Sequence, residues 1–466
     1  MQAVHEFIIW IDGYLWGLPM LMLLFGTHLF LTYRLKFIQK HVVKAIKLSV
    51  SKDDSAGEGD VSQFGALTTA LAATIGTGNI VGVATAIGLG GPGAVLWCWL
   101  TGVFGMATKY SEALLSVKYR VKTSDGTMLG GPMYALENGL HAKWLAVLFC
   151  IFTSVAAFGI GNMVQANSIA VMMQETFDVS PYVSGVVMAV LVAVVILGGV
   201  KAIASVCEKL VPFMAIFYVL GCAAILVLNS QYVFPAVTLI LQSAFTPQAA
   251  GGGFVGASVM IAARYGIARG LFSNESGLGS APIVAAAAQT KNPVRQALVS
   301  MTGTFWDTVV VCAMTGLVLV SSVLKDPAGL NQLSGAALSK AAFEQIPVLG
   351  PIVLTVGLLT FVFSTILGWS YYGERAIEYL LGKKVIMPYR IAWVIAVFIG
   401  SINSLALIWD LADAMNAMMA IPNLIALIAL NGVIVAETNK YLWEDGGLDR
   451  SSKETCKVET ISNDEA

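Results

Sequence analysis

The chain has 466 residues, of which 57% are apolar and 12% are charged, and its formal net charge is −1. Soluble domains carry about 25% charged residues, and so few charges cannot cover a soluble surface of this size, which excludes a soluble enzyme. The balanced charge gives no indication of a nucleic-acid partner, and no two of the six cysteines stand at the CxxC spacing of metal sites. We therefore expect a polytopic membrane protein.

A helix needs about 20 apolar residues to cross the hydrocarbon core of a bilayer. Eleven segments meet this requirement, so we expect an all-α fold with eleven transmembrane helices, called spans 1 to 11. In chain order they are 13–33, 64–90, 94–117, 144–174, 182–200, 209–229, 251–288, 297–323, 349–381, 389–408 and 411–436. The expected organisation is a first helix with a cytoplasmic loop in 1–60, a five-helix repeat in 61–229, an external interfacial segment in 230–250, a second five-helix repeat in 251–436 and a cytoplasmic tail in 437–466.

Lysine and arginine residues predict the orientation, because cytoplasmic loops are enriched in them. Of the 27 such residues, 22 fall in loops on one side, whereas only Lys325 and Lys340 fall in loops on the other. A missed span would have disturbed this alternation. We therefore expect the N-terminus outside and the C-terminus in the cytoplasm.

Two spans contain residues that do not suit a helix in lipid. Span 2 has the sequence TIGTGN from Thr74 to Asn79 at its centre, and span 7 has FSNESGLG from Phe272 to Gly279. Unwound backbone at this depth is tolerated only where it is buried in protein or lines a water-filled cavity. With span 1 set aside, each broken span opens a set of five, and an odd number makes the second set enter from the opposite face. Paired interruptions of this kind indicate the central site of a transporter, although a single glycine-rich motif more often marks close helix packing.

Seven strings carry a resemblance: TIGTGNIVGVATAI, GGPGA, KYSEALLSVKYR, GGPMYALENGL, GIGNMVQANSIA, ARGLFSNESGLGSAPIVAAAA and FSTILGWSYYGERAIEYL. They resemble the alanine/glycine:cation symporter family, the sodium:alanine symporter-like amino acid carriers. The resemblance implies a LeuT-type fold, a 5+5 inverted repeat of spans 2–6 and 7–11 with spans 2 and 7 broken. It also implies uptake of alanine or glycine coupled to sodium by alternating access, without a cofactor besides the coupling ion. The amino acid, sodium and the lipid bilayer are then the partners, and the expected location is the inner (plasma) membrane of a bacterium.

The alternatives to a symporter are a facilitator and a membrane-embedded enzyme. A facilitator would use the same pocket without coupling, and would only equilibrate its substrate. A membrane-embedded enzyme would need a catalytic constellation, but the four histidines do not stand at metal-ligand spacing and the chain has no HExxH or Walker motif. We therefore expect a symporter.

An amino acid presents a carboxylate, an ammonium group and a side chain. We expect the carboxylate to meet backbone N–H groups of the first break, because the N–H end of a half-helix carries partial positive charge. The residues expected there are Gly76, Thr77, Gly78 and Asn79, with Thr74 beside them. We expect the ammonium group to meet the carbonyls of Phe272 and Ser273 and the amide of Asn274, unless Asn274 only caps its half-helix.

Two further spans contribute candidate substrate contacts. Gln165 in span 4 is one, because the third core helix of the resembled family lines the pocket; the alternative is an interhelical hydrogen bond. In span 9, Thr365 and Trp369 are four residues apart and share a helix face. We expect the indole of Trp369 to cap the pocket and limit substrate size, with core packing as the alternative.

The LeuT-type fold also implies a sodium site between the first and eighth core helices. Carried onto this sequence, its ligands are the carbonyls of Ala72, Ile75 and Phe361 and the hydroxyls of Ser364 and Thr365. A hard cation such as sodium accepts neutral oxygens, so this site needs no carboxylate. A second sodium at the Thr74 carbonyl and Asn79 stays open.

Charged residues inside a membrane are costly and should face protein or water. Those deepest in the predicted spans are Arg264, Arg269, Glu275 and Asp307. We expect Glu275 to pair with a neighbouring arginine and hold the second break, with transport of a coupling proton as the alternative. Lys109 and Glu112 are expected to form a snorkelling pair at the cytoplasmic end of span 3, and Glu374 with Arg375 to lie near an inner gate.

Overall fold

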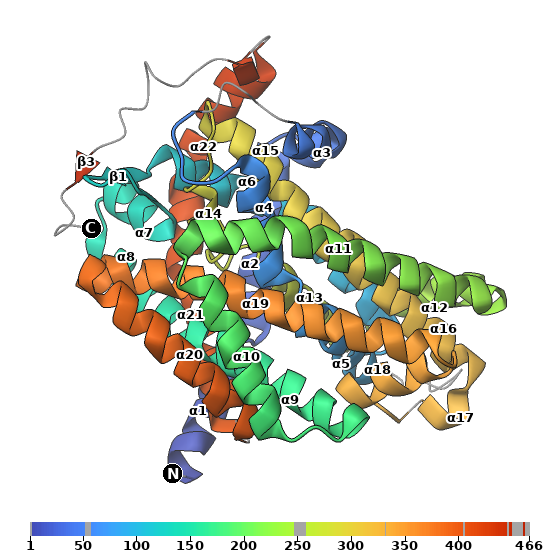
Figure 1. The fold of residues 1–466 in the computed structure, drawn as a ribbon. Helices are drawn as coiled ribbons and strands as arrows, with labels where there is room; N and C mark the ends of the chain where they lie inside the picture. The colour runs from blue at the N-terminus through green and yellow to red at the C-terminus, as the bar shows by residue number, and fades with distance from the viewer. Residues whose placement is uncertain are drawn as a thin grey trace.

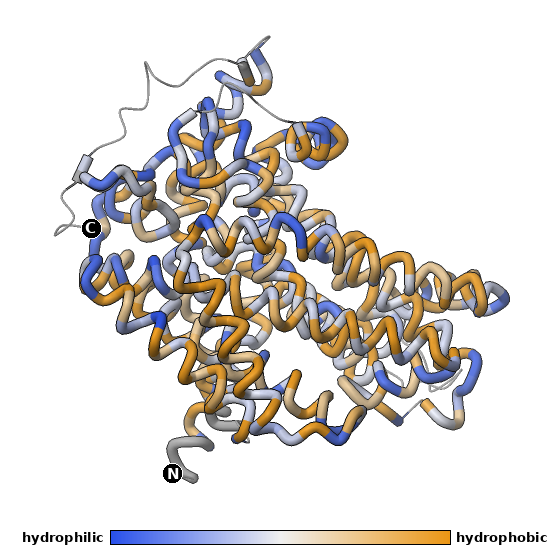
Figure 2. Tube along the Cα trace, viewed as in Figure 1, coloured by the Kyte–Doolittle hydropathy of each residue, from blue (hydrophilic) through white to orange (hydrophobic). Residues whose placement is uncertain are grey.

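The computed structural model describes residues 2–51, 57–246, 258–330, 332–403, 406–444, 447–449 and 460–461, which form a bundle of long helices (Figure 1). Within these residues, seven helices are long and apolar enough to cross a membrane, or up to eight if the bent pair Gln63–Thr74 and Gly78–Gly90 counts as one span. The long helices are mostly apolar, and hydrophilic residues gather at the end that carries α3 (Val42–Val50), β1 (Val121–Thr123) and α22 (Asn431–Thr438) (Figure 2).

Helices cover the ranges predicted as spans 1 to 6. They are α1 (Gln2–Leu15), α2 (Leu18–Arg34), α4 (Gln63–Thr74), α5 (Val83–Gly90), α6 (Gly93–Lys118), α8 (Lys143–Phe158), α9 (Val164–Phe177), α10 (Pro181–Ile196) and α11 (Gly199–Leu228). π-Helical turns, η2 (Gly78–Gly82) and η4 (Gly159–Met163), precede α5 and α9. The loops contain η1 (Ile38–His41), α7 (Pro132–Tyr134) and η3 (Ala135–Gly139).

The second half of the chain is also helical. Its helices are α13 (Val259–Asn274), α14 (Pro282–Ala285), α15 (Pro293–Thr304), η5 (Phe305–Cys312), α16 (Ala313–Lys325), α17 (Pro327–Leu330), α18 (Gly335–Glu344), α19 (Leu349–Leu381), η6 (Lys383–Val385), α20 (Ile386–Ile402) and α21 (Ala406–Ala429). Between the halves, α12 (Ser230–Phe245) occupies the predicted interfacial segment. Residues 247–257, which include the start of predicted span 7, lie outside the described residues.

A small sheet makes the chain mostly rather than entirely helical. Strand β1 pairs antiparallel with β2 (Met128–Leu129) and parallel with β3 (Thr460–Ile461), in the order β2-β1-β3. The turn between β1 and β2 contains Asp125 and Gly126, a favourable hairpin pair, and Gly126 has φ 90°. The described part of the predicted tail also includes η7 (Asn439–Trp443) and η8 (Gly447–Asp449); residues 450–459 and 462–466 lie outside the described residues.

Both predicted helix breaks are present, and they meet in the middle of the bundle. The chain bends by 54° between α4 and the helix that resumes at η2. After α13, Glu275 has φ 54° and Gly277 has φ 92°, a left-handed backbone that stops the helix. A Cβ atom on Gly78 would lie 3.3 Å from Cδ1 of Phe272, so the first break touches the second.

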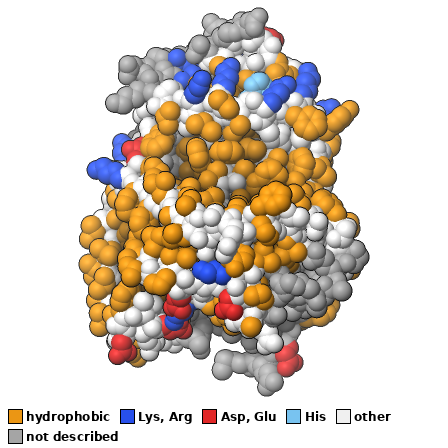
Figure 3. Space-filling view, turned by 90° about the vertical axis from the view of Figure 1, so that its right-hand side faces the viewer, with side chains coloured by type: hydrophobic (Ala, Val, Ile, Leu, Met, Phe, Trp, Pro, Cys, Tyr) orange, Lys and Arg blue, Asp and Glu red, His pale blue; other side chains and the backbone are white. Residues whose placement is uncertain are grey.

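Two groups of helices surround the breaks. Helix α6 packs against α13 and α15, which places it on one side of both breaks, while α19 packs against α4, α8 and α11. The face shown in Figure 3 has a broad band of hydrophobic side chains, with Lys and Arg gathered above it. This distribution suits a protein surrounded by lipid.

Candidate functional site

A large cavity leads to the breaks from one side of the bundle. It has a volume of about 630 Å³ and is lined by residues of α5, α9, α13, α18 and α19. Where it reaches the breaks, its lining residues are Thr77, Gly78 and Phe272. Its charged lining residues are Glu175, Arg269, Lys340 and Glu344. The breaks are therefore accessible from the side that carries α18.

The five residues predicted to bind sodium converge where α4 ends against α19. The Ser364 hydroxyl donates to the Phe361 carbonyl at 2.8 Å and lies 3.2 Å from the Ala72 carbonyl oxygen. The Thr365 hydroxyl donates to the same Phe361 carbonyl at 2.9 Å and lies 3.3 Å from the Ile75 carbonyl oxygen. Each hydroxyl has one hydrogen to donate, so this buried cluster of three carbonyls and two hydroxyls has unused lone pairs. Such a set of oxygens suits a hard cation.

Asn79 braces the first break from within. Its side-chain oxygen accepts from the N–H of Gly76 at 2.9 Å, and its Nδ2 donates to the carboxylate of Asp307 at 2.7 Å. Gly76 and Asn79, both predicted substrate contacts, therefore bond to each other, and Asn79 also bonds to Asp307. The N–H groups of Thr77 and Gly78 begin the next half-helix, where no preceding turn offers a carbonyl, and both residues line the cavity.

Thr74, the last residue of α4, faces away from this cavity. Its hydroxyl bonds back to carbonyls of its own helix, with Ala70 O at 3.2 Å. It lines a second, very small cavity on the far side of the breaks. The structure places Thr74 beside Asn274 on this small cavity and away from Thr77, Gly78 and Phe272, which line the large one.

Gln165 reaches the first break from α9. Its Nε2 donates to the Ile160 carbonyl at 3.0 Å and lies 3.5 Å from the Thr77 hydroxyl oxygen. Its Oε1 is buried and has no hydrogen-bond partner among the described residues. A buried acceptor without a partner is costly, and a ligand with N–H donors would satisfy it.

The second break divides into a cavity residue and two structural residues. Phe272 lines the cavity, whereas the Ser273 hydroxyl donates to the Asp307 carboxylate at 3.0 Å. Asn274 accepts from the N–H of Ser276 at 2.9 Å and is fully buried. The side chain of Asn274 thus stabilises the backbone that leaves α13, and its contact with the ammonium group stays a prediction.

Trp369 and Glu275 pair with each other. The indole Nε1 of Trp369 donates to Glu275 at 3.0 Å, and the Ser280 hydroxyl donates to the other carboxylate oxygen at 2.5 Å. The predicted pairing of Glu275 with an arginine is therefore wrong, because an indole and a hydroxyl supply the donors. Trp369 is 1% exposed and packs against Gly161, and it is not in the lining of the large cavity.

Lys109 and Glu112 are buried in the bundle, so the predicted snorkelling pair is wrong. Lys109 is 4% exposed and Glu112 is 2% exposed. Glu112 accepts from the N–H groups of Gly277 at 2.9 Å and Gly279 at 3.1 Å and from the Asn423 amide at 2.7 Å. It holds the second break, a role that the sequence prediction gave to Glu275. Its partners come from distant segments, so local sequence offered no signal for them.

The side of the breaks opposite the large cavity is closed. Val61, before α4, forms a parallel bridge with Ala288, after α14. Nη1 of Arg120 donates to the carbonyls of Ala286 at 3.0 Å and Ala288 at 2.9 Å, and its Nη2 donates to the Glu58 carbonyl at 2.9 Å. We call these contacts the Arg120 clasp. They tie the chain before one broken helix to the chain after the other.

Glu374 and Arg375 belong to a separate ion-pair network at the end of α19. Arg375 pairs with Glu374 at 2.6 Å and with Glu378 at 2.5 Å, and Arg390 pairs with Glu374 at 2.6 Å. The predicted Glu374–Arg375 association is present, and its role as an inner gate stays a prediction.

One family model and two known proteins match more than nine-tenths of this chain. The model of the sodium:alanine symporter family matches residues 1–454. The sodium/alanine symporter AgcS of Methanococcus maripaludis is 53% identical over 437 residues, 92% of this chain and 96% of that protein. An uncharacterized transporter of Haemophilus influenzae is 54% identical over 444 residues, 94% of this chain and 96% of that protein.

Among solved structures, the crystal structure of MhsT in complex with L-phenylalanine is similar in fold. Its TM-score is 0.54 at 15% sequence identity, and the match covers 86% of this chain and 95% of that chain. MhsT has a LeuT-like fold. At this identity the likeness shows the fold alone, and it agrees with the two broken helices described above.

Proposed function

Since the chain belongs to the sodium:alanine symporter family, and is therefore a membrane transporter that couples amino acid symport to sodium rather than an enzyme, we propose that it imports alanine or glycine by alternating access. The observation that carries the proposal is the oxygen cluster between α4 and α19, which lies directly beside the first break. A cation bound there would hold α4 against α19. Coupling then follows, because the same end of α4 borders the substrate site.

We propose that the amino acid binds where the large cavity reaches the breaks. The N–H groups of Thr77 and Gly78 suit its carboxylate, because they begin a half-helix. The unpartnered Oε1 of Gln165 suits its ammonium group, together with carbonyls of the second break at Phe272. The ring of Phe272 beside Gly78 then limits the size of the substrate side chain.

The remaining part of the proposal concerns topology. We propose eleven spans in two inverted sets of five after span 1, in a bacterial plasma membrane with the N-terminus outside. The gathering of Lys and Arg at one end of the face in Figure 3 supports this orientation. In it the large cavity opens outwards and the Arg120 clasp closes the cytoplasmic side, as alternating access requires of one of its two states.

Uptake of radiolabelled alanine and glycine into proteoliposomes tests the function. An inward sodium gradient is compared with equal sodium on both sides, with pH clamped and the membrane potential set by potassium and valinomycin. A tenfold gradient contributes about 1.4 kcal/mol and 100 mV contributes about 2.3 kcal/mol per charge, enough for an accumulation of a few hundredfold with one sodium. Equilibration without accumulation in both conditions would identify a facilitator instead.

A variant of the substrate site gives a second test. Gln165→Leu removes the unpartnered acceptor and introduces an apolar side chain of similar size. We expect the KM for alanine to rise at least tenfold at saturating sodium, with a smaller change in the sodium concentration that gives half-maximal uptake. An unchanged KM would mean that Gln165 only links its own helix to the break.

A further inference from the structure

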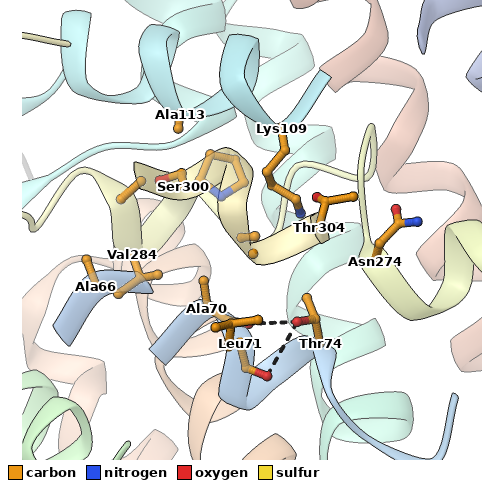
Figure 4. A pocket seen from close by; sticks show the side chains of 14 residues that line it. Ala66, Ala70, Leu71, Thr74, Lys109, Ala113, Asn274, Val284, Ser300 and Thr304 are labelled. Atoms are coloured by element: carbon orange, nitrogen blue, oxygen red, sulfur yellow. Dashed lines mark hydrogen bonds between the residues drawn. The ribbon is translucent and has the colours of Figure 1, made fainter. Parts of the chain in front are cut away.

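A buried lysine lies beside both breaks. Lys109 on α6 is 4% exposed, and its Nζ has no hydrogen-bond partner among the described residues. It lines the very small cavity of about 10 Å³ on the closed side, which is near the lower limit for one water molecule. Figure 4 shows its side chain running from α6 towards Thr304, with Thr74 and Asn274 on the same cavity.

The position of this ammonium group relates it to both half-helices. Thr74 is the last residue of α4 and Asn274 is the last residue of α13, so two helix C-termini end at the cavity that Lys109 lines. A helix C-terminus carries partial negative charge and favours a cation within its last turn. One fixed positive charge therefore interacts favourably with the C-terminal ends of both α4 and α13.

Ionisable groups on the surrounding elements also interact electrostatically with this charge. They are His28 on α2, Glu112 on α6, Glu275 after α13 and Asp307 on η5, and Lys109 interacts electrostatically with each. All four are buried. Glu112 caps the second break and Asp307 holds both Asn79 and Ser273. Among the described residues these carboxylates have no direct ion pair, and Lys109 is their shared counter-charge.

We propose that Lys109 is a positioning residue of the transport site. Its positive charge, supplied by the protein itself, holds the ends of α4 and α13 and the carboxylates of the breaks in the geometry that binds sodium and the amino acid. Lys109 touches neither ligand; it acts through the backbone of α4, whose last turn carries the Ala72 carbonyl of the proposed sodium site. This inference rests on the proposed function.

The test replaces the permanent charge with one that pH controls. Lys109→His keeps a group that is charged below its pKa, and Lys109→Met is neutral with a similar length. Lys118→His is the matched control, because Lys118 lies on the same helix and pairs with Glu437 at 2.7 Å, away from the cavity. Alanine exchange across proteoliposomes with equal sodium on both sides is measured from pH 5.5 to 8.0 and divided by the wild-type rate at each pH.

We expect the Lys109→His ratio to rise at least fivefold from pH 8.0 to pH 5.5. For a histidine that keeps the unperturbed pKa of about 6.5, the protonated fraction changes about thirtyfold over this range, and the charge is present at the low-pH end. The Lys118→His ratio should stay flat, and Lys109→Met should exchange alanine at less than a tenth of the wild-type rate while melting within a few degrees of it.

Three results would overturn the inference. A flat ratio for Lys109→His would do so, and so would wild-type exchange by Lys109→Met. Failure of both variants to fold would assign the charge to folding rather than to transport. A wild-type protein that exchanges alanine without any sodium dependence would contradict the proposed function instead, and the pH ratio of Lys109→His would still report on the charge.

Discussion

Removal of the Thr365 hydroxyl tests the proposed sodium site directly. The hydroxyl oxygen lies 3.3 Å from the Ile75 carbonyl oxygen of α4 and donates to the Phe361 carbonyl of its own helix at 2.9 Å. Thr365→Ala deletes one of the five oxygens that converge there and leaves the backbone carbonyls in place. The helix itself should tolerate alanine, which has the highest helix propensity.

The size of the effect follows from the burial of the cluster. Thr365 is 2% exposed and Ser364 is fully buried, so bulk water cannot freely replace the lost oxygen. An interaction between a neutral polar group and a charge is worth about 1.5–3 kcal/mol, which corresponds to roughly ten- to 150-fold in affinity. A water molecule that entered the space left by the hydroxyl would recover part of this, so tenfold is the smallest change we expect.

The assay measures the sodium concentration for half-maximal alanine uptake at saturating alanine. Thr360→Ala is the matched control, because Thr360 lies on the same helix and its hydroxyl bonds only to carbonyls of that helix, at 2.7 Å from Val356 O. We expect a change below twofold for Thr360→Ala. Equal sodium dependence of the two variants would refute the assignment of the oxygen cluster to sodium.

Three further predictions concern the framework of the site. Gly161→Val should abolish uptake and lower the melting temperature, since even a Cβ atom would lie 2.3 Å from Cβ of Trp369; wild-type melting would contradict the close packing. Arg120→Ala should loosen the Arg120 clasp and speed hydrogen–deuterium exchange of the chain after α14 at least threefold, and unchanged exchange would mean that the backbone bridge closes this side alone. Glu112→Ala should lower the free energy of unfolding by about 1–3 kcal/mol for each buried donor left without an acceptor, such as the N–H of Gly277; a variant as stable as the wild type in denaturant would exclude a capping role.

The two breaks were predictable from the local sequence, whereas the oxygen cluster was predictable only from the family resemblance. Glycine, asparagine and serine inside apolar segments conflict with a helix in lipid, so the breaks at Gly78 and Gly277 could be read from the sequence. The oxygen cluster at Ser364 and Thr365 could not, because its members are ordinary residues that two distant helices bring together. The prediction came from the family resemblance, which supplied the pairing of α4 with α19.

Two features decide where the buried charges lie: the depth of each residue, which the sequence gives, and the direction of its side chain, which it does not. Lys109 stands nine residues before the end of α6 at Lys118, about 13 Å along a helix that rises ~1.5 Å per residue. That distance is too long for a lysine side chain to reach the interface, so depth alone argued against snorkelling. The partners of Glu112, at Gly277 and Asn423, depend on which face of α6 points inwards. A nearly uniform apolar helix carries little information about that face, and only the assembled bundle determines which carboxylate caps the second break and which pairs with the indole.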